Sequence, residues 1–213
     1  MNGVFITGSN TGVGKTTVSV DIIKHLRKNR QIVVRKPVET DCKIVNGSFQ
    51  PKDAIKLNEA CSSGEDLGIV CGFCFELEAS PEEASAHSGR LLKLNDLVKA
   101  CKSRAGDNFV FVEGAGGFFS PIANKALNSD LAIKLNLPVI IVVRDELGAV
   151  TQALLTINAA KSQQLNIACV ILNEIEPNKL GNAQALRAYT KAPIIEYSKN
   201  KLSNFCSEVE RLI

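Results

Sequence analysis

The sequence has no hydrophobic run long enough to cross a membrane. Its longest apolar stretch covers residues 137–143, whereas a membrane-spanning helix needs roughly 20 apolar residues. Only Met1, Asn2 and Gly3 precede the first apolar stretch, so no signal or transit peptide is expected. We therefore expect a soluble protein without a membrane partner, located in the cytoplasm.

An excess of charge of one sign is also missing. The chain has 25 lysines and arginines against 22 aspartates and glutamates, a net charge of +3. No basic block is long enough to follow a nucleic-acid backbone, so we expect no nucleic-acid partner. Histidine is scarce as well: His25 and His87 are the only two. Neither is surrounded by an acid–base constellation in the sequence, and both are expected to be structural.

Cysteine is present, but not in a disulfide pattern. The seven cysteines are an odd number spread along the chain, which is typical of a reducing compartment. Cys71 and Cys74 form a C-x-x-C pair, a spacing found in redox sites and in zinc sites. Here the pair lies within an apolar run and no second pair follows. We expect core cysteines, with a functional pair as the less favoured alternative.

A chain of 213 residues is long enough for one domain with a substantial core. The expected strands cover residues 4–6, 32–34, 69–75, 109–113, 137–143, 168–173 and 193–195, and helices are expected to begin near residues 15, 52, 94, 150 and 182. Residues 41–51 are polar and are expected to form a loop. The alternation predicts a single α/β domain over residues 1–213, with a doubly wound, mostly parallel sheet and helices on both faces.

The stretch GSNTGVGKTT, residues 8–17, is the most informative part of the sequence. It follows the first strand and opens a helix, which is the context of a phosphate-binding loop and predicts a P-loop NTPase-like fold. Glycines let backbone N–H groups approach phosphates, and the helix N-terminus adds its positive dipole. Lys15 is expected to be solvent-accessible and to reach the β- and γ-phosphates, and the Thr16 hydroxyl to hold Mg²⁺. Five residues separate Gly8 from Gly14, one more than the common spacing.

Two further strand ends are expected beside this loop, because parallel sheets bind ligands at the carboxyl ends of their strands. One carries Lys36 and Thr40; the alternative for Lys36 is an ordinary exposed lysine. The other ends in Glu113, followed by Gly-Ala-Gly-Gly, and an acid at this place can face a Mg²⁺ ion. Asp53 opens a helix, where the dipole favours an acid in any case, so a metal ligand there needs a second carboxylate nearby.

Together these motifs resemble the ATP-dependent dethiobiotin synthetases. The resemblance covers residues 4–173 and includes the lengthened loop, whose five-residue spacing is the family's own. It also includes RKPVET at residues 35–40, Asp53, Ser80-Pro81, EGAGG at residues 113–117 and LGAVT at residues 147–151. The chain departs from the family near its end, where Ile-Glu-Tyr-Ser at residues 195–198 replaces a Gly-x-Ile-Pro segment near the nucleotide base.

The resemblance implies an ATP-dependent ligase of biotin biosynthesis. In that family CO₂ adds to one amine of 7,8-diaminononanoate as a carbamate, ATP phosphorylates the carbamate, and the second amine closes the ureido ring. Such a site chiefly positions groups and neutralises charge. The resemblance also implies a homodimer whose active sites lie at the subunit interface.

The family's roles transfer to matching positions of this chain. Lys15 and Lys36 are the expected catalytic residues, with Lys36 on the carbamate and the transferring phosphoryl group. The expected metal ligands are Thr16, Asp53 and Glu113. Nucleotide contacts are expected from Asn10, Thr11, Gly12, Val13, Gly14, Lys15, Thr16, Thr17, Glu113, Gly116 and, on the adenine, Asn173. Substrate contacts are expected from Thr11, Lys36, Thr40, Gly116 and Gly117 and, at the substrate carboxylate from the neighbouring subunit, Leu147, Gly148, Ala149, Val150 and Thr151.

The main alternative is a partition or septum-positioning ATPase, a nucleotide switch of the same fold. Those proteins carry an additional lysine early in the loop, where this chain has Asn10. They often end in a basic amphipathic helix, whereas the tail here carries Glu208 and Glu210. A non-catalytic nucleotide-binding module is a third interpretation, but it leaves Lys36 and Asp53 unexplained.

Overall fold

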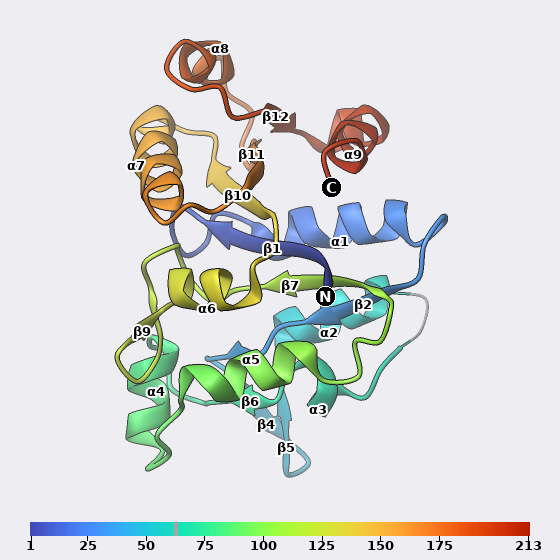
Figure 1. Ribbon diagram of the computed structural model, residues 1–213, viewed down its shortest axis with the longest axis vertical. Coiled ribbons are helices and arrows are strands. Elements are labelled where there is room, and N and C mark those ends of the chain that lie inside the picture. Colours follow the sequence, from blue (N-terminus) through green and yellow to red (C-terminus); the bar gives the residue numbers. More distant parts are fainter. Residues whose placement is uncertain (62–63) are drawn as a thin grey trace.

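The structure is a computed structural model that describes residues 1–61 and 64–213. Its centre is a six-stranded sheet in the order β12-β11-β10-β1-β7-β2 (Figure 1), and every neighbouring pair is parallel. The strands are β1 (Asn2–Gly8), β2 (Ile32–Arg35), β7 (Phe109–Glu113), β10 (Val139–Arg144), β11 (Ile167–Asn173) and β12 (Ile194–Tyr197). The chain winds away from β1 in both directions, so the predicted doubly wound parallel sheet is confirmed.

Helices cover both faces of this sheet because its strands are apolar on both sides. Phe5 of β1 belongs to one buried cluster, while its neighbours Val4 and Ile6 belong to the other. The first face carries α4 (Pro81–His87), α5 (Leu94–Lys102), α6 (Asn128–Leu135), α7 (Ala149–Ser162) and α8 (Asn182–Arg187). The second carries α1 (Lys15–Leu26), α2 (Lys52–Ala60) and α9 (Leu202–Glu210). Side chains that alternate along a strand thus supply two cores.

The expected loop at residues 41–51 is wrong. It contains an antiparallel hairpin of β4 (Lys43–Val45) and β5 (Ser48–Gln50). Asn46 and Gly47 join the two strands with φ values of 52° and 77°. An Asn-Gly pair with positive φ at both residues is the signature of a two-residue hairpin turn, and this signal was present in the sequence.

The strand expected at residues 69–75 is also wrong in its extent. The run divides into a short helix, α3 (Leu67–Val70), and a two-residue strand, β6 (Phe73–Cys74), that pairs with β3 (Val38–Glu39). Asp66 caps α3, since its Oδ1 accepts a hydrogen bond from Gly68 N at 2.7 Å. A short apolar run does not distinguish strand from helix by periodicity alone.

The cysteines form no disulfide framework, as predicted: all seven are free thiols. Cys71 is buried and Cys74 half-buried, and their sulfur atoms lie 3.5 Å apart as a hydrogen-bonded pair. His25 Nε2 forms a partly exposed hydrogen bond with Glu210 Oε2 at 2.8 Å. Within residues 1–61 and 64–213, no helix combines the length and apolar character required to span a bilayer.

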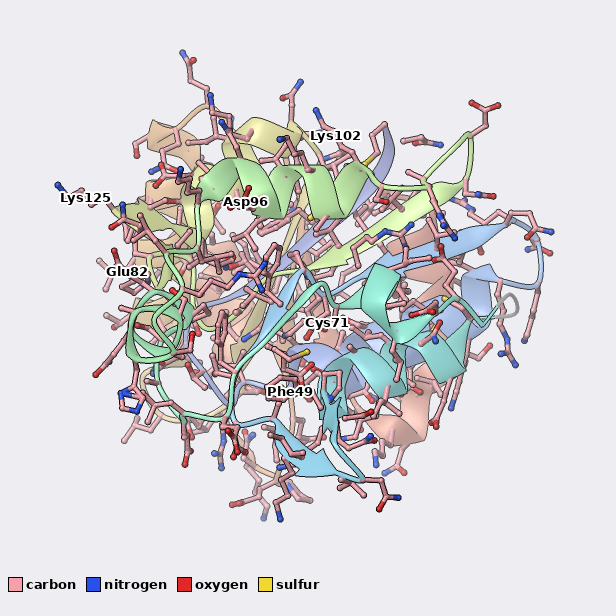
Figure 2. All side chains as sticks on the ribbon, turned by 90° about the horizontal axis from the view of Figure 1, so that it is seen from below. Phe49, Cys71, Glu82, Asp96, Lys102 and Lys125 are labelled. Carbon is pink, nitrogen blue, oxygen red and sulfur yellow. The ribbon has the colours of Figure 1, made fainter. Side chains whose placement is uncertain are left out.

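Two small strands lie next to α4. They are β8 (Pro121–Ala123) and β9 (Ala126–Leu127), which pair as an antiparallel hairpin. The hairpin is tied to α4, because Lys125 N at its turn donates to Glu82 Oε1 at 2.6 Å (Figure 2). Residues from α4 and β8 therefore lie side by side next to the carboxyl end of the sheet.

Candidate active site

The phosphate loop joins β1 to α1 and is closely packed against β11. Gly14 caps α1 with φ 85°, and a Cβ at this position would lie 2.1 Å from Asn173 Nδ2. Asn173, the last residue of β11, donates from Nδ2 to the Val13 carbonyl oxygen at 2.8 Å. Only glycine combines this conformation with such a close approach. The structure thus brings Asn173 to the phosphate loop.

Lys15 is not solvent-accessible, contrary to the sequence-based expectation. It is the first residue of α1 and only 7% exposed. Its Nζ donates to the Asn10 carbonyl oxygen at 3.3 Å, so the side chain lies over the loop. Burial, together with the like charge of Lys36, lowers the pKa of Lys15 to about 8. A short loop wrapped around its own lysine was not visible in the sequence pattern.

Glu113 is the centre of the polar network. It is completely buried at the end of β7. Its Oε1 accepts hydrogen bonds from Thr16 Oγ1 and from Lys36 Nζ, both at 2.8 Å. Its Oε2 accepts one from Ser19 Oγ at 2.9 Å. The sequence analysis missed Ser19, although it stands three residues after Thr16 and therefore on the same face of α1.

Lys36 is a buried cation, which excludes the alternative of an ordinary exposed lysine. It is 4% exposed, and its Nζ lies 3.6 Å from Asp53 Oδ2 and donates to the Gly114 carbonyl oxygen at 3.1 Å. Burial alone would lower the pKa of Lys36, but the negative charges of Glu113 and Asp53 outweigh it and raise that pKa above its ordinary value. Lys36 therefore stays protonated at neutral pH.

Glu39 fixes the position of Asp53, a role that the sequence analysis did not find. The Glu39 carboxylate accepts hydrogen bonds from Asp53 N at 2.8 Å and Ala54 N at 2.9 Å, so it caps the N-terminus of α2. Burial raises the pKa of Glu39, while these two backbone hydrogen bonds oppose the rise. A cap supplied by a residue 14 positions earlier leaves no local sequence signal.

The glycine-rich turn after Glu113 lies against the phosphate loop. A Cβ at Gly117 would approach Ser9 O at 3.2 Å, and Phe118 N donates to Gly8 O at 2.9 Å. The other side of the turn is held by the buried Asn128, whose Nδ2 donates to Gly117 O at 3.2 Å and to Thr7 Oγ1 at 3.1 Å. Gly116 and Gly117 are thereby fixed beside the loop.

These segments surround a cavity of about 400 Å³. Its lining includes Thr11, Lys15, Thr16, Lys36, Thr40 and Asp53. A second hollow of about 330 Å³ continues from it and shares Thr11, Thr40, Glu78, Ala115 and Gly116. The second hollow is completed by Pro81 from α4 and Pro121 from β8. A charged cavity at the phosphate loop thus opens into a less polar one.

The expected carboxylate turn at residues 147–151 lies apart from this cavity within one chain. Gly148 caps α7 with φ 94°, and Leu147 before it is 89% exposed. None of the five residues is among those that line the cavity. The start of α7 is linked to the phosphate loop by a hydrogen bond from Ser9 Oγ to Gln152 Oε1 at 3.1 Å. The assignment of this turn to a neighbouring subunit's substrate stays a prediction.

The expected metal ligands are brought together, with a lysine between them. Thr16 donates a hydrogen bond to Glu113, and Lys36 forms ion pairs with the carboxylates of both Glu113 and Asp53. Among the described residues, no group of three or more His, Cys, Asp and Glu side chains is arranged to hold a metal ion, at this site or at another. Oxygen atoms of one hydroxyl and two carboxylates, beside a phosphate loop, are the donors that Mg²⁺ favours.

Comparison with solved structures supports the fold. A plasmid partition protein from Borrelia burgdorferi gives a TM-score of 0.60 over 100% of both chains, at 14% identity. A ParA family ATPase from Chlorobium tepidum gives 0.55 over 100% of this chain and 92% of the other, at 11% identity. Such low identities establish a shared P-loop NTPase fold and nothing about activity.

Comparison of sequences is more specific. Residues 2–196 match a family model described as an AAA domain. The ATP-dependent dethiobiotin synthetase BioD of Vesicomyosocius okutanii subsp. Calyptogena okutanii is 48% identical over 213 residues, which cover 100% of this chain and 97% of the relative. The protein of the same name from Ruthia magnifica subsp. Calyptogena magnifica is 47% identical, with 100% and 99% covered. The chain therefore belongs to the ATP-dependent dethiobiotin synthetase family of enzymes.

Proposed function

We propose that this enzyme converts 7,8-diaminononanoate, CO₂ and ATP to dethiobiotin, ADP and phosphate. One observation carries the proposal beyond family membership: a second buried lysine, Lys36, lies beside the phosphate loop and is held by Glu113 and Asp53. The additional lysine of the partition and septum-positioning switches lies early in the loop, where this chain has Asn10, so Lys36 is a different cation from a different segment. A reaction that develops negative charge on both a carbamate and a phosphoryl group needs such a cation.

The chemistry divides into three steps. One amine of the substrate attacks CO₂ and loses a proton to give a carbamate. A carbamate oxygen then attacks the γ-phosphorus of ATP, and ADP leaves. Finally the second amine, as the free base, attacks the carbonyl carbon of the mixed anhydride, the C–O bond to phosphate breaks, the nitrogen releases a proton to water, and the ureido ring closes. Each step uses groups of the substrates themselves, so the protein supplies position and charge.

The described geometry suits these tasks. Lys15 and the N-terminus of α1 face the phosphates, and Lys36 faces the carbamate and the transferring phosphoryl group. Thr11, Thr40 and Gly116 line both hollows, and Gly117 follows Gly116 in the turn packed against the phosphate loop. Asn173 Nδ2 donates a hydrogen bond to the phosphate loop. Its Oδ1 is left as an acceptor for the amino group of adenine.

Thr16, Asp53 and Glu113 fit a Mg²⁺ ion by their oxygen chemistry. Such an ion would neutralise phosphate charge beside Lys36. Asp53→Asn is expected to raise the Mg²⁺ concentration for half-maximal rate about tenfold, because one anionic oxygen is lost. The measurement is initial rate against Mg²⁺ at saturating ATP.

The matched control is Asp96→Asn, which changes another acid in the first turn of a helix, α5, on the face of the sheet opposite to α2. This variant should keep the wild-type Mg²⁺ requirement. If Asp53→Asn also keeps it, Asp53 acts only as a favourable helix N-terminal acid and a partner of Lys36.

We further propose a homodimer in which the turn at residues 147–151 binds the substrate carboxylate of the neighbouring subunit. Large apolar side chains are exposed around this turn and α7: Leu147 is 89%, Leu155 67% and Phe119 52% exposed. A second copy would cover them. Free backbone N–H groups at the start of the 14-residue helix α7 suit a carboxylate.

Val150→Pro tests this shared site. Proline is tolerated in the first turn of a helix but removes one N–H group. We expect a dimer by molecular mass in solution, a KM for diaminononanoate raised about tenfold and nearly unchanged ATP binding. A monomer that turns over at full rate would contradict the shared site.

The function itself is tested by phosphate release from ATP. Release should require both diaminononanoate and bicarbonate, and dethiobiotin should appear in equal amount. Substrate-independent release that responds to a partner protein would favour a nucleotide switch instead. The reaction uses soluble metabolites, in keeping with a cytoplasmic location.

A further inference from the structure

Four acidic side chains line the phosphate-loop cavity, and three of them are already engaged. Glu39 caps α2 through two hydrogen bonds, and Asp53 pairs with Lys36. Asp41 forms an ion pair with Lys52 at 3.1 Å. The fourth, Glu78, forms no side-chain hydrogen bond or ion pair with any other residue that the structure describes. Its carboxylate is available to a ligand.

The backbone holds Glu78 in a defined place. Ala79 N donates to Leu77 O at 3.0 Å, which closes a three-residue turn with Glu78 at its centre. The turn is anchored to the segment that follows β3, since Asp41 N also donates to Leu77 O, at 3.4 Å. Immediately after it, Ser80 Oγ caps α4 by accepting from Glu83 N at 3.3 Å. Glu78 is therefore presented by a turn fixed at both ends.

Glu78 stands where the two hollows join. It lines both the charged cavity at the phosphate loop and the less polar hollow between α4 and β8. Among the described residues that line the second hollow, Glu78 is the only charged one. A ligand that extends from the phosphates into this hollow therefore passes a single unpaired carboxylate.

We propose that Glu78 is a specificity-determining residue that binds the ammonium group of the diamine substrate. This inference rests on the proposed function and deepens it. An alkyl diamine is cationic at its reacting end, and a carboxylate at the junction would hold that end at the mouth of the phosphate-loop cavity while the alkyl chain follows the hollow. The opposite charge also rejects anionic ligands of the same length from the junction.

Glu78→Gln removes the charge and keeps the shape. We expect the KM for diaminononanoate to rise about fivefold, and its Kd, measured by calorimetry without ATP, to rise by the same factor. The Kd of ATP should stay within about twofold. The difference between variant and wild type should shrink as salt is added, because an exposed charge pair is screened. Glu78→Asp, which keeps the charge, should restore most of the affinity.

The matched control is Glu76→Gln. Glu76 is also exposed and lies two residues earlier, but it lines another hollow, between Phe49 and Arg90. It should behave as wild type. If wild-type enzyme makes dethiobiotin and Glu78→Gln leaves both KM and Kd unchanged, the role of Glu78 is refuted and the proposed function stands. Wild-type protein that neither binds the diamine nor turns it over overturns both proposals.

Discussion

Lys36→Met is expected to lower kcat about a thousandfold, while the Kd of ATP changes by less than about threefold. The reason is the position of Lys36, which lies behind the phosphate loop, 2.8 Å from Glu113 and 3.6 Å from Asp53. The positive charge of Lys36 therefore stabilises the transition state of phosphoryl transfer more than it stabilises bound ATP. Pre-steady-state phosphoryl transfer and equilibrium ATP binding measure the two effects separately.

The same variant should lose stability, because Glu113 would remain buried without its cation. A broken buried pair typically costs about 3 kcal/mol or more in the free energy of unfolding. The double variant Lys36→Met with Glu113→Gln removes both charges, so it should recover much of that stability without recovering kcat. An unchanged kcat with only a higher KM for ATP would instead show that Lys36 is an ordinary nucleotide contact.

Lys15→Met is expected to reduce kcat/KM for ATP about a thousandfold or more, since the γ-phosphate loses its main counter-charge. Methionine keeps most of the length of the lysine and its apolar stem. Unlike Lys36→Met, this variant should be no less stable than wild type at pH 7. Turnover at the wild-type rate would contradict the assignment of the phosphate loop.

The stability prediction follows from the pKa of Lys15, which burial lowers from 10.5 to about 8. Below pH 8 the folded protein keeps a charge that its surroundings disfavour, and this lowers the free energy of unfolding. Between pH 8 and 10.5 the folded form releases the proton before the unfolded form does, so the penalty fades. The stability advantage of Lys15→Met should therefore be greatest below pH 8 and vanish by about pH 10.5. Urea unfolding at several pH values measures it.

The elements that were predictable from the sequence have local causes. Continuous apolar runs such as residues 109–113 and 137–143 gave buried parallel strands, and the glycine-rich stretch gave the loop before α1. The strand-end position of Glu113 followed from the same pattern. Each of these depends on residues that are neighbours in sequence, and each appeared where it was expected.

The features that sequence analysis missed depend on contacts between distant segments. Glu39 caps the N-terminus of α2, and Asn128 holds the glycine-rich turn that follows Glu113. Lys15 was expected at the surface because neither the loop around it nor Lys36 beside it can be placed from periodicity. The Asn-Gly hairpin is different: its signal was local, but the polar composition around it favoured a loop.

The central place of β1 in the sheet also determines the order in which the molecule can assemble during synthesis. β1 spans Asn2–Gly8, yet its two neighbours are β7 (Phe109–Glu113) and β10 (Val139–Arg144). During synthesis β1 therefore has no partner on one edge until residue 113 has been made, and none on the other until residue 144. During that interval the nascent chain carries an unpaired apolar strand and an unformed nucleotide site. The phosphate loop gains its contact with β11 only after residue 173 has been made, because Asn173 Nδ2 holds the Val13 carbonyl oxygen.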